Sequence, residues 1–478
     1  MLFVISSGTQ SYHQPALFAT FHSSFATHFC VICTYHRFVF IQILSVSLVI
    51  DIVSKISEVK HKLAEIQTRI YYFLLGWKRI YSNKRDECIC LKTDNNEISS
   101  CNGKKQNIQI INPKEMAEII YMINDEKYHF KSAFDTETGA YVRTGILDAN
   151  GKDTGVDPFM ASYPHLIDVG IMGHCIHGKT GLCAKAGIGC YQSGLIIEKP
   201  NMVLDDFRWI AEQCKGRCNQ LALGGRGDPD QHENFEEILK ICRQNFLIPN
   251  FTTSGYGITR EIAALCKEYC GAVAVSWYRS DYTSKAIQLL LDAGVKTNIH
   301  YVLAKNSISE AIDRLKNNDF PKGINAVIFL LHKPVGLGKA ENVLNIDDHR
   351  VREFFEQIDN RHPFKVGMDS CSVPGAVRFC KNVLPESLDT CEGGRYSCYI
   401  SADMIMVPCS FDQEKQYEVS LHSMNIEAAW NSEPFERFRN KMRGACPECK
   451  NKALCMGGCP LMPEIVFCHY KERKPVQF

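Results

Sequence analysis

The residues of this sequence that could do chemistry are its cysteines, and many of them fall in two short blocks. The first block lies in GHCIHGKTGLCAKAGIGCYQSG, where seven and then six residues separate Cys175, Cys183 and Cys190. Three thiolates in one Gly- and Lys-rich loop can hold a metal ion or cluster and leave one coordination position open. An open position lets a substrate or cofactor bind the metal, whereas purely structural sites are usually closed. Zinc with His174 or His177 as a fourth ligand is the alternative for this block.

The second block lies near the C-terminus, in CPECKNKALCMGGC and the segment before it. Four cysteines have the spacing C-x2-C-x5-C-x3-C, one follows nine residues later and three precede them: Cys446, Cys449, Cys455 and Cys459, then Cys468, and upstream Cys391, Cys398 and Cys409. Metal ligands are spaced in this way when a loop must wrap one ion or cluster. The spacing alone does not distinguish zinc from iron–sulfur clusters.

Composition favours a cytoplasmic metal protein over a disulfide scaffold or a nucleic-acid binder. The chain of 478 residues contains 23 cysteines, an odd number that cannot pair completely within the chain. Disulfides are therefore the weaker interpretation, and we expect a reducing, cytoplasmic compartment. The net charge is only +1, so the basic field that nucleic-acid binding usually needs is missing. The apolar run from Phe38 to Ile50 is shorter than the about 20 residues of a membrane-spanning helix, so no membrane anchor is expected.

The elements that must position the first block form a repeating strand and helix pattern between residues 160 and 345. Short apolar, β-rich runs predict strands at 165–172, 220–225, 250–255, 272–278, 298–303 and 326–331. Amphipathic stretches between them predict helices at 202–214, 234–244, 260–270, 284–294 and 309–318. This alternation predicts an α/β fold with right-handed crossovers and a parallel sheet buried on both faces, in six units that make a partial (β/α)6 barrel.

Ligands of parallel α/β sheets bind beyond the carboxyl ends of the strands, so the residues directly after each strand are the candidates for binding. The first cysteine block follows the first predicted strand, and Gly224 and Gly225 end the second. A Gly pair permits positive φ and a close approach of the backbone to a ligand, although alone it is an ordinary turn. Its position at the same end of the sheet as the three cysteines favours a binding role.

Together these features resemble the radical S-adenosylmethionine (SAM) superfamily. The resemblance implies that Cys175, Cys183 and Cys190 hold a [4Fe-4S] cluster whose open iron binds the amino and carboxylate groups of SAM. In that superfamily the reduced cluster cleaves SAM to methionine and a 5'-deoxyadenosyl radical, which abstracts a hydrogen from an unactivated carbon. The resemblance also implies four contacts to the cofactor: Gly224, Gly225, Ser254 and Ser276. The sequence departs from the usual C-x3-C-x2-C spacing, and it has Arg226 and Asp228 where a GGE-type acidic pattern is usual.

The C-terminal block resembles the SPASM domain, which holds two auxiliary [4Fe-4S] clusters in many peptide-modifying radical enzymes. The resemblance rests on the cysteine spacing and on the phrases MVPCSF and AAWNSEPFERFR. Met404 stands where this domain usually has Gly, which predicts a different turn. Cys371 and Cys380 fall outside both ligand sets; Cys371 is either an inert core thiol or a donor of a hydrogen atom or proton. The resemblance implies that the first auxiliary cluster is held by Cys391, Cys398, Cys409 and Cys459, and the second by Cys446, Cys449, Cys455 and Cys468.

The function implied by this resemblance is that of a radical SAM oxidoreductase that modifies a peptide or protein, by a crosslink or an oxidation in ribosomal peptide maturation. Auxiliary clusters suit such a reaction because they can carry an electron away from a substrate radical. We expect a peptide or protein substrate and an electron donor such as flavodoxin or ferredoxin, and neither nucleic acid nor a membrane as partner. Anaerobic sulfatase maturation is an alternative, but that family has an acidic residue after the cysteine corresponding to Cys409, where this sequence has Ser410. A non-enzymatic iron–sulfur or zinc-binding protein is the alternative from another class, which the strand and helix repeat disfavours.

The expected domain organisation follows these boundaries. The first hundred residues carry no part of the barrel pattern. The parts are an N-terminal extension (1–105), a lead-in segment (106–160), the partial barrel (161–345), a bridging region (346–390), the SPASM domain (391–470) and a tail (471–478).

Overall fold

The computed structural model describes residues 2–5, 120–185, 189–194 and 196–469. The chain divides into two compact units, one comprising residues 1–9 and 117–478 and the other residues 10–116. All described residues belong to the first unit, so the apolar run at 38–50 lies outside them. Within the described part of the chain, no helix is long and apolar enough to cross a membrane.

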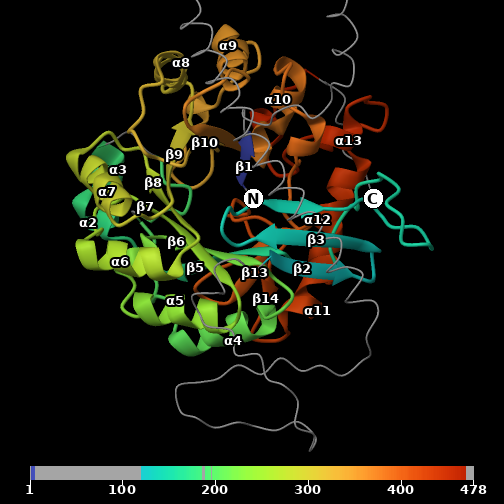
Figure 1. Ribbon diagram of the computed structural model, residues 1–478, viewed down its shortest axis with the longest axis horizontal. Coiled ribbons are helices and arrows are strands. Elements are labelled where there is room, and N and C mark those ends of the chain that lie inside the picture. The colour runs from blue at the N-terminus through green and yellow to red at the C-terminus, as the bar shows by residue number, and fades with distance from the viewer. Residues whose placement is uncertain (1, 6–119, 186–188, 195, 470–478) are drawn as a thin grey trace, which may run out of the picture. The chain divides into compact units, whose positions relative to one another are not determined.

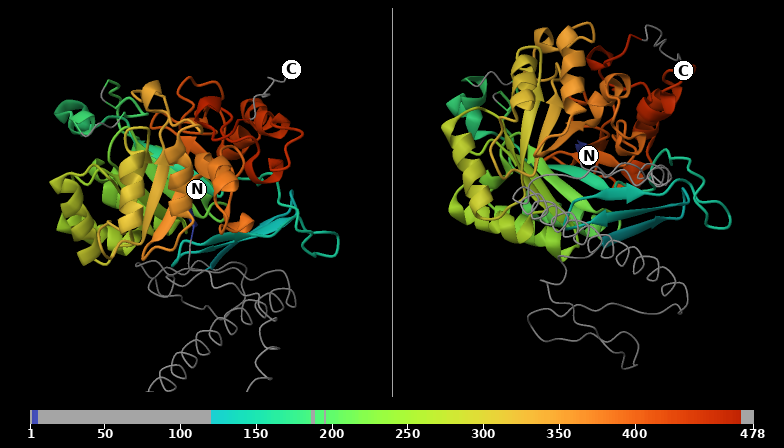
Figure 2. Two further views of the ribbon diagram at one scale, coloured as in Figure 1. Left: turned by 90° about the horizontal axis from the view of Figure 1, so that it is seen from above. Right: turned by 45° about the horizontal axis from the view of Figure 1, so that its top comes forward.

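Seven consecutive parallel strands form the centre of a curved, open sheet (Figures 1 and 2). They are β5 (Leu166–Met172), β6 (Gln220–Gly225), β7 (Ile248–Thr253), β8 (Ala272–Ser276), β9 (Thr297–Leu303), β10 (Ala326–Leu331) and β11 (Lys365–Asp369). The first six confirm the predicted α/β repeat, and β6 and β10 have the predicted bounds. The sequence pattern did not predict β11, which pairs in parallel with β10. The bridging region therefore extends the sheet.

Helices cover the outer face of this sheet (Figure 2). Helix α8 illustrates why: Ile308, Ala311, Ile312 and Leu315 recur at the helical spacing and are buried, while polar residues occupy the other side. The burial of such a stripe against the strands is what stabilises each crossover. The helices are α4 (Leu204–Cys214), α5 (Phe235–Gln244), α6 (Arg260–Tyr269), α7 (Asp281–Asp292), α8 (Ile308–Asn317) and α9 (His349–Ile358).

The inner face of the sheet carries polar side chains. In β9, Tyr301 packs on the ring of Phe329 at 5.3 Å between centroids, whereas the neighbouring His300 bonds Thr252 Oγ1 at 3.1 Å across the inner face. Successive side chains of a strand point to opposite faces, so this alternation separates an apolar outer layer from a polar interior. Both faces are buried as predicted, but the interior has the hydrogen-bonding groups that a polar ligand needs.

Both edges of the sheet are extended by segments outside the predicted barrel. Strand β12 (Ser397–Ile400) pairs in parallel with β5, and β13 (Ile405–Val407) and β14 (Val419–Ser420) follow in antiparallel order. The C-terminal block is thereby joined to the sheet through main-chain hydrogen bonds. At the other edge, β1 (Leu2–Ile5) pairs antiparallel with β11, which corrects the expectation that the first hundred residues carry no part of the barrel.

The C-terminal region is built from short helices around buried polar anchors. These helices are α10 (Val373–Phe379), α11 (Ile426–Trp430), α12 (Glu433–Gly444) and α13 (Lys452–Cys455). Trp430 is fully buried and donates to Ala161 O at 2.9 Å, and Arg439 donates to Gly394 O at 2.6 Å. Met404 adopts φ +58°, the left-handed conformation that Gly favours, so the turn predicted to differ retains that backbone shape.

A small antiparallel sheet precedes the main sheet and was not predicted. It comprises β2 (Ile120–Asp125), β3 (Phe130–Asp135) and β4 (Tyr141–Arg143). Arg143 at its edge forms ion pairs with Asp157 at 2.7 Å and with Asp389 at 2.5 Å. The lead-in segment is therefore tied to the residues just before the C-terminal cysteines.

Candidate functional site

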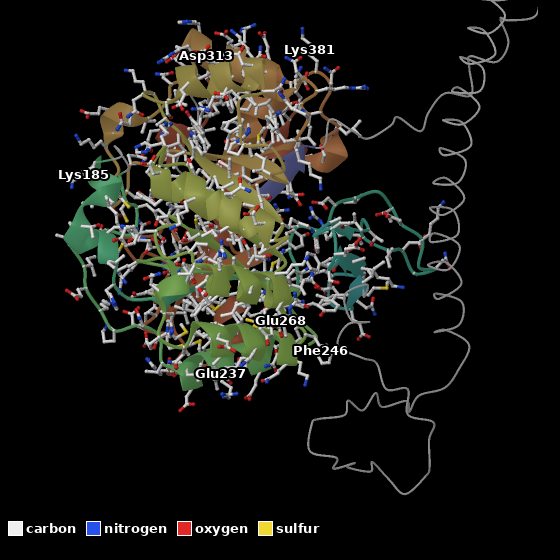
Figure 3. All side chains as sticks on the ribbon, turned by 60° about the vertical axis from the view of Figure 1, so that its left-hand side comes forward. Lys185, Glu237, Phe246, Glu268, Asp313 and Lys381 are labelled. Carbon is white, nitrogen blue, oxygen red and sulfur yellow. The ribbon has the colours of Figure 1, made fainter. Side chains whose placement is uncertain are left out.

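The first cysteine block occupies the loop after β5, at the carboxyl end of the parallel strands. Cys175 immediately precedes the short helix α2 (Ile176–Thr180), Cys183 lies in α3 (Leu182–Lys185), and Cys190 follows shortly after. The three thiols interact electrostatically with one another. Lys185, at the end of α3, lies at the surface in Figure 3, whereas Cys183 is buried. The three predicted ligands therefore lie in one segment at this end of the sheet, although no three Cys, His, Asp or Glu side chains of the described residues are packed closely enough to hold one metal ion.

Backbone N–H groups point at two of these sulfurs. The N–H groups of His177 and Gly178 donate to the Cys175 thiol, and the N–H of Gly194 donates to Cys190 Sγ at 3.4 Å. Burial raises the pKa of Cys175. Donors of this kind favour the charged sulfur and are one of the contacts that set the potential of an iron–sulfur cluster.

The third thiol is linked to the end of β8. Cys183 Sγ donates to the hydroxyl of Tyr278 at 3.6 Å, and Tyr278 in turn bonds the side chain of Ser276. Burial raises the pKa of Cys183 to about 12, so the free thiol is protonated at neutral pH. Coordination to a metal deprotonates such a thiol outright. Ser276, predicted to contact the cofactor, is thus linked to a predicted metal ligand by two hydrogen bonds through Tyr278.

The two glycines that end β6 have different surroundings. Gly225 has φ +113°, and a Cβ there would lie 2.4 Å from Met172 O. Gly is therefore required at this position by the backbone itself. A Cβ on Gly224 would meet no atom within 4 Å. Gly224 faces open space at the carboxyl end of the sheet, where a bound cofactor can approach the backbone.

A buried polar cluster lies beside these glycines. Ser254, after β7, donates through its backbone N–H to Asp228 Oδ1 at 2.9 Å and through its hydroxyl to the other carboxylate oxygen. His177 Nε2 lies 2.8 Å from Ser254 Oγ and 3.3 Å from Asp228 Oδ2. The sequence pattern indicated His177 only as an alternative zinc ligand and did not predict this contact. Its partners lie 51 and 77 residues away along the chain, so no local pattern could have indicated it.

Three buried polar atoms of the described chain, on β9 and on the loops after β5 and β6, are unpaired. Among the described residues, His300 Nε2, Arg226 Nε and Gln192 Nε2 are buried without a hydrogen-bond partner. Burial lowers the pKa of His300 to about 4, so its ring is neutral at pH 7. Buried polar atoms are normally satisfied, so each of these atoms is available to a bound polar ligand. Their chemistry suits carboxylate, hydroxyl or adenine groups.

The C-terminal cysteines also gather in groups, which are wider than a single ion would require. In the described part of the chain, no three Cys, His, Asp or Glu side chains are packed closely enough to hold one metal ion. One group is that predicted for the second auxiliary cluster, because the Cys455 thiol interacts with those of Cys446, Cys449 and Cys468.

The other group differs from the predicted set. Cys391 and Cys409 flank Gly393, since a Cβ on Gly393 would lie 3.6 Å from Cys391 Sγ and 3.6 Å from Cys409 Cβ. Both thiols interact with Cys371, which forms a hydrogen bond with Cys459. The thiol of Cys398 instead interacts with Cys214 and Cys218, in the helix-covered layer. Cys380 lies apart from both groups, with its thiol 3.6 Å from Phe355 O.

Two aromatic rings connect the first cysteine block to this group. Tyr191 follows Cys190, and its ring centroid lies 4.5 Å from that of Phe411, two residues after Cys409. Burial raises the pKa of Tyr191 to about 12, so its hydroxyl is neutral. The loop after β10 closes over the same place, where Leu337 N donates to Cys190 O at 2.9 Å. The two cysteine groups therefore lie on either side of one aromatic contact.

The comparison with protein families identifies the C-terminal block. The family model for SPASM, an iron–sulfur cluster-binding domain, matches residues 391–455. This match confirms the predicted SPASM domain and its iron–sulfur cofactor. No curated protein sequence matches the chain.

Several solved structures are similar to the chain at low sequence identity. Streptococcus suis SuiB bound to S-adenosylmethionine is 16% identical with a TM-score of 0.49, and the alignment covers 65% of this chain and 78% of that chain. The same protein bound to precursor peptide SuiA is 15% identical with a TM-score of 0.47, covering 65% and 76%. Native anSMEcpe with bound AdoMet and Cp18Cys peptide is 15% identical with a TM-score of 0.46, covering 63% and 91%.

Proposed function

We propose that this chain is a radical SAM enzyme that reductively cleaves SAM and modifies a peptide or protein substrate. The observation that carries the proposal is the convergence of Cys175, Cys183 and Cys190 at the carboxyl end of a parallel sheet that continues through β12 into a SPASM domain. Three thiolates leave one iron of a four-iron cluster open to a cofactor. Such a site belongs to redox chemistry on a bound ligand.

The residues around the open space would hold and orient the cofactor. Gly224 leaves room for it beside the backbone, and the Asp228 carboxylate lies where it can attract a positively charged amino group. The buried Nε atom of Arg226 can donate to a carboxylate. When bound, cluster and SAM together supply a 5'-deoxyadenosyl radical. The chain contributes a water-excluding interior and a fixed position for the substrate carbon.

A peptide substrate is supported by the surroundings of the sheet's carboxyl end. A cavity of about 470 Å³ lies between the loop after β10 and the C-terminal region, lined by Pro334, Ala340, Val343, Leu344, Asn345 and Glu464. Its volume falls in the range of ligand pockets and can admit a peptide side chain. On the loops after β5 and β7, Ile176 and Tyr256 expose 38% and 47% of their surface. A peptide bound at this end of the sheet would have these two side chains available for apolar contact.

The SPASM clusters suit an oxidative modification. An oxidation or crosslink removes a second electron from the substrate after the first hydrogen is abstracted, and a cluster near the site can accept it. The Tyr191–Phe411 contact supports this role, because it links the residue after Cys190 to the segment that carries Cys409. We therefore infer a crosslink or dehydrogenation of a peptide, with a flavodoxin or ferredoxin as the external donor for SAM cleavage.

The proposal is tested by anaerobic reconstitution of the full chain. The wild type should bind about 12 iron atoms, four for each cluster, and form 5'-deoxyadenosine with dithionite. The triple variant Cys175→Ala/Cys183→Ala/Cys190→Ala should retain about eight iron atoms and form none. Cys270→Ala, a helix-end thiol outside all three groups, is the matched control and should behave like the wild type. 5'-Deoxyadenosine from the triple variant, or stoichiometric zinc instead of iron, would contradict the proposal.

The substrate class needs a separate test. Short Cys-rich or repeat-containing peptides encoded in neighbouring genes are the first substrates to coexpress. An oxidative crosslink or dehydrogenation removes two hydrogens, which mass spectrometry detects as a defined mass loss. An unchanged peptide mass, with 5'-deoxyadenosine still formed, would leave the radical chemistry in place and exclude that peptide.

A further inference from the structure

A four-iron cluster held only by protein takes four thiolates. Of the four cysteines predicted for the first auxiliary cluster, Cys398 lies in a place from which it does not reach the other three. Cys398 is the second residue of β12 and pairs with Ile167 of β5. Its side chain is 1% exposed and points to the helix-covered face, toward Cys214 and Cys218. Tyr399, the next residue, points to the opposite face, where it interacts with Tyr191.

The geometry of a strand prevents Cys398 from joining the other three thiols. Turning Cys398 inward would need a one-residue shift in the register of β12 against β5. Such a shift would move every side chain of β12 to the opposite face of the sheet. Tyr399 and Ile400 would then exchange their environments, although Ile400 is fully buried on the helix-covered face. The register of β12 against β5 thus holds Cys398 in the outer core layer.

Cys371 occupies the position that Cys398 leaves open. It lies in the single 3-10 turn Ser370–Ser372 directly after β11, and its thiol forms a hydrogen bond with Cys459. The thiols of Cys391 and Cys409 both interact with it. Four cysteines from four separate segments of the chain therefore lie in one neighbourhood, with Cys371 as their common partner.

The turn that carries Cys371 is fixed to the sheet. Asp369, the last residue of β11, accepts a hydrogen bond from Leu331 N at 3.0 Å and one from Ser372 Oγ at 2.8 Å. The same carboxylate pairs with Lys333, a lysine only 6% exposed. These contacts hold Cys371 at a defined position between the ends of β10 and β11, as a cluster ligand requires.

The charge of this pocket also suits a cluster. The Lys333 ammonium pairs with Asp369, two residues before Cys371, and lies 4.7 Å from the centroid of the Phe411 ring, two residues after Cys409. Four thiolates around one cluster give the site a net negative charge that a buried ammonium group offsets. A neighbouring cation is one of the features that set the potential of iron–sulfur clusters.

We propose that Cys371, and not Cys398, completes the ligand set of the first auxiliary cluster, with Cys391, Cys409 and Cys459. The proposal rests on the part of the proposed function that gives the SPASM domain two clusters, and it does not depend on SAM cleavage. It replaces both earlier interpretations of Cys371, as an inert thiol and as a hydrogen donor.

The test compares two single substitutions in the full chain that already carries Cys175→Ala/Cys183→Ala/Cys190→Ala. All iron in this background belongs to the SPASM domain, so its failure to cleave SAM does not affect the result. Adding Cys371→Ala should lower the iron content from about eight to about four atoms per chain, with an equal loss of acid-labile sulfide. Adding Cys398→Ala should leave about eight. Retention of about eight by the Cys371 variant, or an equal loss in the Cys398 variant, would overturn the assignment.

A second pair of variants guards against misfolding. Cys371→Ser replaces sulfur by an oxygen that can still bind iron, so the cluster should persist while the electron paramagnetic resonance spectrum of one reduced cluster changes. Cys398→Ser places a hydroxyl in the core and should leave the spectrum as it is. A spectrum that changes for Cys398→Ser and not for Cys371→Ser would overturn the assignment even if both proteins retain their iron.

Discussion

The glycine pair at the end of β6 can separate the requirements of the fold from those of the cofactor. Both glycines are predicted to contact SAM, yet their surroundings differ. A Cβ on Gly225 would lie 2.4 Å from Met172 O and 2.9 Å from Met172 N, at a φ of +113°. A Cβ on Gly224 would meet nothing within 4 Å, and its φ lies outside the left-handed region. Substitution by Ala should therefore have opposite consequences at neighbouring positions.

Two effects determine how much Gly225→Ala destabilises the folded protein: the unfavourable backbone conformation and the crowding of the added methyl group. A non-Gly residue held in an unfavourable φ region costs about 1–3 kcal/mol, and an overpacked methyl group costs about 1–3 kcal/mol more. The smaller freedom of the unfolded chain offsets about 0.4–1 kcal/mol of this. Gly225→Ala should thus lower the free energy of unfolding by roughly 1–5 kcal/mol. Gly224→Ala should leave stability unchanged or raise it by about 0.4–1 kcal/mol.

Cofactor binding should show the reverse order for the two variants. The methyl group of Gly224→Ala enters the space proposed for SAM, and an overlap costing about 1.4 kcal/mol weakens binding tenfold. The assay is thermal unfolding of both reconstituted variants without SAM, followed by calorimetric titration with SAM under anaerobic conditions. The reasoning fails if Gly225→Ala unfolds at the wild-type temperature, or if Gly224→Ala binds SAM as tightly as the wild type.

Two further predictions concern the stability of the fold. Burial lowers the pKa of His165 from 6.5 to about 4. Between these two pH values the imidazole is neutral in the folded protein but protonated in the unfolded chain. The free energy of unfolding therefore falls as the pH drops from about 6.5 to about 4. Between pH 7.5 and 5.5 the protonation of His165 in the unfolded chain should lower the free energy of unfolding by about 1.4 kcal/mol. Thermal melts at the two pH values should therefore show a smaller drop in melting temperature for His165→Gln than for the wild type. An equal drop in both proteins would refute this prediction. The substitution Arg439→Met leaves the carbonyl oxygens of Gly394 and Trp430 unpaired and should lower the free energy of unfolding by about 2–6 kcal/mol. Thermal melts should show this loss, and iron assays should show less bound iron. An unchanged melting temperature would contradict the prediction.

Sequence periodicity predicted the central strands and their helices because local physics dominates there. The runs of β6 and β10 are apolar and end at turn residues, and the predicted and observed bounds coincide. Helices such as α8 carry their buried stripe at a spacing that only a helix can bury. Cys446, Cys449 and Cys455 lie in one short segment, and the resemblance to the SPASM domain predicts Cys468 as their fourth partner.

Strands with weak local signals were not accessible in this way. Strand β11 reads KVGMD, in which Lys, Gly and Asp leave only two apolar positions, and it forms because β10 offers an unpaired edge. Strand β12 has a readable pattern, but its place beside β5 follows from how the chain returns to the sheet. Such pairings depend on tertiary contacts between segments far apart in sequence.

The chemistry divides along the same line. The two cysteine blocks, and the prediction of an open coordination position in the first, follow from residue type and spacing, whereas the division of the second block into two ligand sets follows from its resemblance to the SPASM domain. The identity of each ligand depends on which face of a strand a side chain occupies. Cys398 lies within the motif but is turned outward by the register of β12, whereas Cys371 lies outside it and reaches Cys459 through the order of β10 and β11. Spacing along the chain measures sequence separation, and a cluster selects its ligands by separation in space, which only the folded sheet determines.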